Sequence, residues 1–174
     1  HKRIAGFFKA DDMQGIERHK GYVKALQEAG LPYDPEDVVW YHTEDRKMKP
    51  AIMLRLMEKE GHLPDGIVCY NDQIAAMLIE ELGRLGYKVP EDVSVTGFDD
   101  SLFAQRGDGI TTVAHPQEKL GEMAAELLLE KINGVPKEKS RIPERIQPQL
   151  IVRGSCRDRR VPEKRTAAAA ASKS

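Results

Sequence analysis

Four short apolar runs alternate with three longer segments of helical periodicity in the first hundred residues. Each run ends abruptly in polar residues, which is typical of buried strands in a parallel sheet. The runs cover residues 3–8, 37–41, 66–70 and 93–98, and the helical segments cover residues 14–29, 47–60 and 72–85. Because this βαβαβαβ order comes with short connections, it predicts an α/β fold with a doubly wound parallel sheet and right-handed crossovers.

Short polar residues and glycine mark the ends of the predicted helices. Asp11 or Asp12 can cap the first helix, and Asn71 or Asp72 can cap the third. Gly86 follows the third helix, at the position where a left-handed residue commonly ends a helix.

The regular alternation stops at Ser101. The next elements are a loop at 101–109, an extended run at 110–114 and a helix at 116–132. The apolar stripe of this helix consists of Leu120, Ala124, Leu127 and Leu128. Residues 141–153 look extended, and Pro143 and Pro148 within them favour an edge strand or a ribbon. Residues 161–174 have no pattern that can bury apolar surface.

Composition limits the size and class of the molecule. The length of 174 residues suits one domain, or one domain plus part of another. The net charge of −1 does not indicate nucleic-acid binding by this segment. No apolar run approaches the roughly 20 residues of a membrane-spanning helix. Cys69 and Cys156 are interpreted as buried hydrophobes in a reducing compartment, and a disulfide stays open as an alternative. Because the chain enters a strand almost directly after His1, we expect a piece of a longer protein.

The common signatures of catalysis and cofactor binding do not occur. The sequence has no glycine-rich phosphate-binding loop and no Gly-x-Ser-x-Gly motif. Its five histidines have no ligand-like spacing with one another or with the cysteines. We therefore expect a protein that is not an enzyme and that needs no metal or cofactor.

A series of motifs occurs in a specific order and spacing. They are Arg18-x-x-Gly21, Pro64-Asp65-Gly66-Ile67, Asn71-Asp72, residues 86–100, Ile110-Thr111-Thr112-Val113 and Leu120-Gly121. Over roughly residues 1–155 the chain resembles the effector-binding region of the lactose/galactose-repressor (LacI/GalR) family. The resemblance implies two α/β lobes of the type I periplasmic-binding-protein-like fold, joined by crossing strands, with a sugar closed between them.

The resemblance also implies how the chain divides. Residues 1–109 would form the C-terminal lobe of the effector-binding domain. Residues 110–136 would be a crossing strand and a helix that belong to the N-terminal lobe. Residues 137–156 would return to the C-terminal lobe, and residues 157–174 would be a disordered tail. The chain would then hold mostly the C-terminal lobe of a two-lobe domain.

Polar residues follow the predicted strands, at the edge where ligands bind in open α/β sheets. Asp99 ends the fourth strand, Asn71 ends the third, Lys9 follows the first, and Arg18 lies on the first helix. A carboxylate can accept from paired sugar hydroxyls, and a guanidinium can donate to them. The structural alternatives are a turn residue for Asp99, a helix cap for Asn71 and a solvated side chain for Arg18 and Lys9. For each of these four residues, the family resemblance implies an effector-binding role as the other possibility.

Further effector-binding candidates are Gln14, His42, Tyr70, Phe98 and His115. The two aromatic residues are equally compatible with the core. His42 falls near a position where the family often has an aromatic residue beside the ligand, and His115 lies in the predicted crossing run. Asp72 and Asp100 are interpreted as local structure. Lys9 and Gln14 belong to a segment, residues 9–15, that resembles the arabinose-responsive branch of the family.

The resemblance implies the sugar-sensing domain of a bacterial transcriptional repressor in the cytoplasm. L-arabinose is the first expected effector, operator DNA would be bound by a separate N-terminal domain outside this chain, and a homodimer would match a two-fold operator. Two alternatives stay open: a periplasmic sugar-binding protein of a transport system, and an enzyme on the same type of sheet. A signal peptide in the preceding sequence would indicate the transport protein, whereas a DNA-binding domain there would indicate the repressor. Turnover of a sugar would indicate the enzyme.

Overall fold

The computed structural model describes residues 1–136 and 146–160. Its centre is a four-stranded sheet in the order β2-β1-β3-β4, and every strand pair is parallel. The strands are β1 (Ile4–Lys9), β2 (Val38–Tyr41), β3 (Gly66–Cys69) and β4 (Ser94–Thr96). Ile67 of β3 lies beside Ala5 of β1 and Val95 of β4, so that three buried side chains line one face. The predicted parallel α/β sheet is confirmed.

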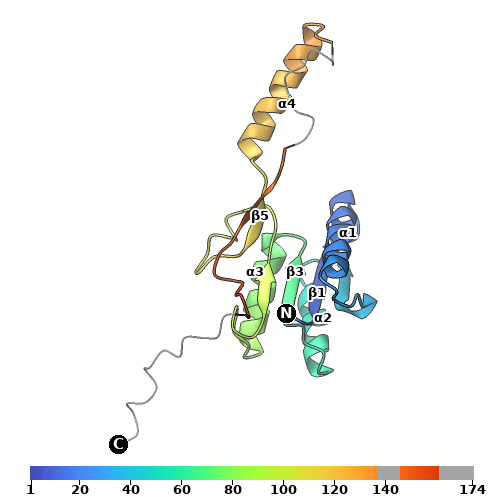
Figure 1. Ribbon diagram of the computed structural model, residues 1–174, viewed down its shortest axis with the longest axis vertical. Coiled ribbons are helices and arrows are strands. Elements are labelled where there is room, and N and C mark those ends of the chain that lie inside the picture. The colour runs from blue at the N-terminus through green and yellow to red at the C-terminus, as the bar shows by residue number, and fades with distance from the viewer. Residues whose placement is uncertain (137–145, 161–174) are drawn as a thin grey trace, which may run out of the picture.

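Helices cover both faces of this sheet, as Figure 1 shows for α1 and α3. The helices are α1 (Met13–Glu28), α2 (Lys49–Lys59) and α3 (Asp72–Arg84), and a short 3-10 helix η1 (Pro35–Asp37) precedes β2. Leu54 of α2 and Leu78 of α3 are fully buried in the larger core cluster. Tyr22 of α1 packs with Phe8 in a second cluster on the opposite face. The doubly wound arrangement is therefore also confirmed.

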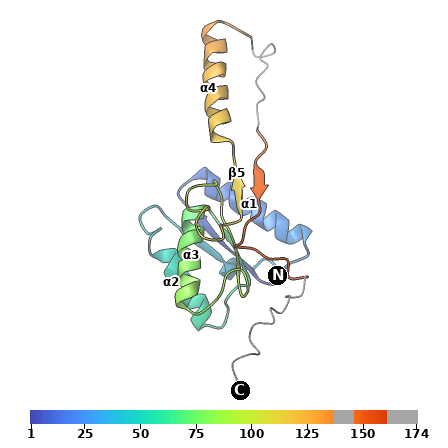
Figure 2. The same cartoon turned by 90° about the vertical axis from the view of Figure 1, so that its left-hand side faces the viewer.

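A two-stranded antiparallel ribbon leads from the sheet to a long helix. β5 (Thr112–Ala114) pairs with β6 (Gln149–Ile151), and α4 (Gln117–Ile132) follows β5. Figures 1 and 2 show α4 standing well beyond the layers of the sheet. Leu127, Leu128 and Ile132 on this helix are 41%, 59% and 70% exposed. Within the described residues, much of the apolar surface of α4 is therefore left uncovered.

The segments predicted to be extended or disordered near the C-terminus are described only in part. β6 falls inside the predicted edge strand, whereas residues 141–145 and 161–174 lie outside the described residues. Residues 157–160, which the prediction placed in a disordered tail, include a contact with the segments just before β3 and β4. Arg159 there donates to the backbone carbonyls of Asp92 and Asp65. No helix in the described part of the chain is long and apolar enough to span a membrane.

An aromatic cluster lies where α1 covers the sheet. The ring centroid of His19 is 4.9 Å from that of Trp40 and 5.5 Å from that of Phe8. The Nε2 atom of His19 also lies 3.3 Å from the hydroxyl of Tyr33. Burial among these rings disfavours the charged imidazolium, so the pKa of His19 is below its usual value.

We expect the free energy of unfolding to fall as pH drops below about 6.5, the usual pKa of histidine. Below that pH the unfolded chain binds a proton at His19, whereas the folded chain takes it up only at lower pH, because its pKa is lowered. Urea unfolding at pH 7.5 and 5.5, followed by fluorescence of Trp40, the only tryptophan, measures this difference. The variant His19→Phe keeps an aromatic ring and removes the titration. A parent and a variant with the same pH dependence would contradict the prediction.

Candidate functional site

Arg18 of α1 lies at the centre of the candidate site. Its Cζ atom is 3.8 Å from the ring centroid of Phe98 and 4.5 Å from that of Tyr70. Nη1 donates to the backbone carbonyl of Tyr70, and Nη2 lies 3.4 Å from Oδ1 of Asp99. Three segments far apart in sequence therefore meet at one guanidinium: α1, the end of β3 and the end of β4.

The chain turns sharply where β4 ends. Asp99 has a φ of 101° and Asp100 a φ of 51°, conformations that residues other than glycine seldom adopt. The backbone N–H of Asp99 donates to the carbonyl of Val113 in β5 at 2.9 Å. This turn ends β4 at Thr96 rather than at residue 98, and it directs the carboxylate of Asp99 toward Arg18.

Lys9 reaches the site through a chain of polar contacts. Its Nζ lies 3.1 Å from Oδ2 of Asp12, and the hydroxyl of Tyr70 donates to the same oxygen at 2.7 Å. Burial and the hydrogen bond to Asp12 raise the pKa of Tyr70 to about 12. For Asp12, burial opposes ionisation, but hydrogen bonds from Tyr70, Gly15 and Lys9 outweigh it and lower the pKa. At neutral pH a neutral phenol and an ammonium group therefore share one carboxylate.

Two caps anchor the helices that carry the site. Asp12 accepts from the backbone N–H of Gly15 at 2.7 Å and caps α1. Asn71 accepts from the backbone N–H of Ile74 at 3.1 Å and caps α3. The structural alternative for Asn71 is thus present in the structure, and its effector-binding role stays a prediction.

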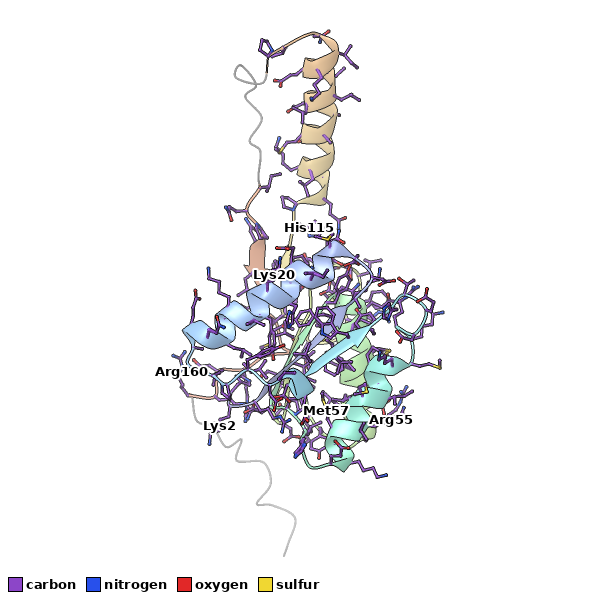
Figure 3. All side chains as sticks on the ribbon, turned by 90° about the vertical axis from the view of Figure 1, so that its right-hand side faces the viewer. Lys2, Lys20, Arg55, Met57, His115 and Arg160 are labelled. Atoms are coloured by element: carbon purple, nitrogen blue, oxygen red, sulfur yellow. The ribbon has the colours of Figure 1, made fainter. Side chains whose placement is uncertain are left out.

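The structure brings together most of the residues singled out from the sequence. Arg18, Tyr70, Phe98 and Asp99 are in direct contact. The ring of His115 is 6.0 Å from that of Phe98, and Figure 3 shows His115 at the junction between the sheet and α4. By contrast, Gln14 and His42 are exposed, and within the described residues neither side chain has a hydrogen bond, ion pair or ring contact with this cluster. The backbone N–H of His42 donates to Asp45 instead.

Two hollows border the cluster. The larger, of about 760 Å³, lies beside Asp99 and His115 and reaches Gln117 and Gln149. The smaller, of about 250 Å³, is lined by Lys9, Tyr70 and Asn71 among others. Sequence reasoning did not single out Gln117 or Gln149. No periodicity distinguishes an amide that faces a cavity from one that faces solvent, so the sequence carried no signal for them.

The chemistry of this cluster suits a neutral ligand with several hydroxyl groups. Arg18 supplies directed donors, the carboxylate of Asp99 can accept from paired hydroxyls, and Phe98 and Tyr70 offer flat apolar faces. Small-molecule sites combine apolar walls with a few directed polar groups in this way. Within the described residues, no cluster of three or more histidine, cysteine or acidic side chains has an arrangement that could hold a metal ion.

Comparison with known proteins identifies the family. The profile of the periplasmic binding protein-like domain matches residues 1–156. The chain belongs to this family. Its match to the periplasmic-binding-protein-like domain agrees with the parallel sheet, the helices on both faces and the polar residues at the strand ends.

Two curated relatives of this chain are transcriptional repressors. The chain is 39% identical over 162 residues to the arabinose metabolism transcriptional repressor of Geobacillus stearothermophilus, covering 91% of this chain and 44% of that protein. It is 38% identical to the repressor of the same description from Halalkalibacterium halodurans, covering 89% of this chain and 43% of that protein. The chain thus spans less than half the length of these relatives.

Solved structures of LacI-family regulators share the fold. The regulator CelR, solved as a cellobiose complex, is 32% identical with a TM-score of 0.74, covering 89% of this chain and 47% of that one. A sugar-binding regulator of the LacI family from Escherichia coli, complexed with phosphate, has a TM-score of 0.78 at 25% identity, covering 89% of this chain and 55% of that one. These comparisons confirm the resemblance to the lactose/galactose-repressor family.

Proposed function

We propose that this chain forms most of the C-terminal lobe of the sugar-sensing domain of a cytoplasmic transcriptional repressor. The observation that carries the proposal is the convergence of Arg18, Asp99, Tyr70 and Phe98 at the carboxyl ends of β3 and β4. Directed donors, acceptors and ring faces meet there in the manner that a sugar requires. The relatives support a repressor rather than a transport protein or an enzyme, because those named above are regulators of transcription.

L-arabinose is the proposed effector. Two relatives that cover about nine tenths of the chain are repressors of arabinose metabolism. The smaller hollow is lined by Lys9, Tyr70 and Asn71, and the larger one by Asp99 and His115. Both hollows therefore border the proposed effector site. Gln14 and His42 are proposed to approach the sugar only in the complete domain, since both are exposed here.

The other half of the cleft is proposed to lie outside this chain. α4 is reached through the ribbon β5–β6 and exposes Leu127, Leu128 and Ile132. A surface of this kind is unfavourable in water and calls for a packing partner. We assign α4 to the N-terminal lobe, with residues 1–109 and 137–156 in the C-terminal lobe; residues 137–145 of the latter range lie outside the described residues. Operator DNA would be bound by a separate N-terminal domain, in a homodimer.

Sugar and operator are proposed to act through two linked equilibria. Closing the lobes around the sugar would favour one arrangement of the repressor, and that arrangement would have a different affinity for DNA. A ligand can bias such a switch only by its differential affinity for the two arrangements.

Calorimetry of the complete protein that carries this chain tests the proposal. We expect tight binding of L-arabinose and weaker binding of galactose, ribose and fructose, because directed polar groups discriminate between hydroxyl arrangements. Hypoxanthine serves as the non-sugar control. Binding of hypoxanthine, together with no measurable binding of any of the four sugars, would reject a sugar effector.

A further inference from the structure

The turn after β4 is held in an unfavourable conformation by its neighbours. Asp99 and Asp100 are consecutive, neither is glycine, and both have positive φ. Such a backbone persists only where surrounding contacts over-determine it. The contacts that hold this turn come from both segments that lead to and from α4.

One guanidinium joins the turn to both connecting segments. Nη2 of Arg153, just after β6, lies 2.6 Å from Oδ1 of Asp100. Nη1 of the same residue donates to the carbonyl of Ile110, just before β5, at 3.1 Å. The side chains of Arg153 and Asp100 are 21% and 25% exposed, so that the pair is mostly shielded from water.

A buried carboxylate fixes the far side of the turn. Oδ2 of Asp72 accepts from the backbone N–H of Ser101 at 2.7 Å, and Oδ1 accepts from the hydroxyl of Thr112 at 2.6 Å. Asp72 and Thr112 are both almost completely buried. The residue next to Asp100 is therefore tied to β5 independently of Arg153.

We propose that Asp100 and Arg153 are positioning residues for the effector site. Their ion pair holds the turn in which Asp99 presents its carboxylate to Arg18 and donates its amide to Val113. Through Arg153 it also ties the effector-contacting turn to the segments on both sides of α4. A shift of Asp99 on sugar binding is thereby passed to both connecting segments together. This inference rests on the proposed function of the site and deepens it.

The test uses the complete protein with Asp100→Asn, Arg153→Gln and the double variant. Asparagine tolerates a left-handed backbone, so Asp100→Asn removes the charge without adding backbone strain. The matched control is Asp158→Asn, which removes an exposed ion pair with Arg160 on the same C-terminal segment. Affinity for L-arabinose is measured by calorimetry well below the unfolding temperature. Hydrogen exchange of the amides at 97–101 is measured without ligand.

Each single variant is expected to lose about tenfold in sugar affinity, the cost of roughly one disrupted charged contact. The double variant should lose no more than either single one, because the two residues act as a unit. The amides at 97–101 should exchange faster in all three variants, and Asp158→Asn should behave like the parent. The proposal would be overturned if the single variants kept the parent's sugar affinity, if their losses of binding free energy added in the double variant, or if the amides at 97–101 exchanged at the parent's rate. If the parent binds no arabinose, the proposed effector fails, and the exchange measurement alone still decides whether the pair holds the turn.

Discussion

Gly15→Ala should destabilise the protein by about 3 kcal/mol, at the upper end of what overpacking of a well-packed site commonly costs. A Cβ at Gly15 would lie 1.8 Å from the backbone carbonyl oxygen of Lys9 and 2.8 Å from its carbon. Backbone atoms cannot rotate away as a side chain can, so the start of α1 would have to move off the end of β1. Since Arg18 follows within one turn, sugar affinity should fall together with stability.

Gly21→Ala is the matched control on the same helix. Apart from the neighbouring residues and backbone of α1 itself, no atom lies within 4 Å of a Cβ placed there, and Gly21 is exposed. Alanine in a helix interior is more favourable than glycine by roughly 0.5–1 kcal/mol, so this variant should be slightly more stable than the parent. Urea unfolding of the two variants measures the contrast. Equal stabilities would mean that the close approach of α1 to Lys9 is relieved at no cost.

Arg18→Ala should weaken sugar binding by the complete protein by roughly 1.5–3 kcal/mol, the usual cost of losing a hydrogen bond to a charged group. This corresponds to about a 10- to 150-fold higher Kd. The guanidinium contacts Asp99, the Tyr70 carbonyl and the faces of two rings, so its removal also leaves the carboxylate without its cation. Folding should suffer less than binding, because the side chain of Asp99 is 31% exposed and water can reach it.

Two further substitutions on α1 sharpen this measurement. Arg18→Lys keeps the charge but loses the planar fork, so its affinity should lie between those of the parent and Arg18→Ala. Lys24→Ala removes an exposed cation from the same helix, whose ion pair with Glu28 is solvated. Calorimetry should find the parent affinity for Lys24→Ala. A parent-like affinity for Arg18→Ala would remove Arg18 from the effector site.

The order of strands and helices could be predicted from the sequence because it depends on local properties. Apolar runs, helical periodicity and stop signals such as Gly86 act over a few residues, and short connections leave few topologies open. The same reasoning placed Asp99, Tyr70 and Phe98 at the ends of β3 and β4. Since parallel strands end on one side of the sheet, these residues were bound to lie near one another.

The tertiary structure decided which partner each polar side chain near these strand ends contacts. Asn71 caps α3 and Asp12 is shared by Lys9 and Tyr70, outcomes that depend on distances between separate elements. The bond from Arg153 to Asp100 joins positions 53 residues apart, and no local pattern encodes such a pair.

The sequence by itself determined the sheet, its helices and the edge at which the site lies, because periodicity and chain connectivity are local. Only the tertiary structure decided that Arg18 stacks on Phe98, that Asp99 and Asp100 take left-handed conformations and that α4 extends from the sheet with exposed leucines. Each of these depends on where distant segments come to rest. A residue's partners are set by three-dimensional packing, which the pattern along the chain does not specify.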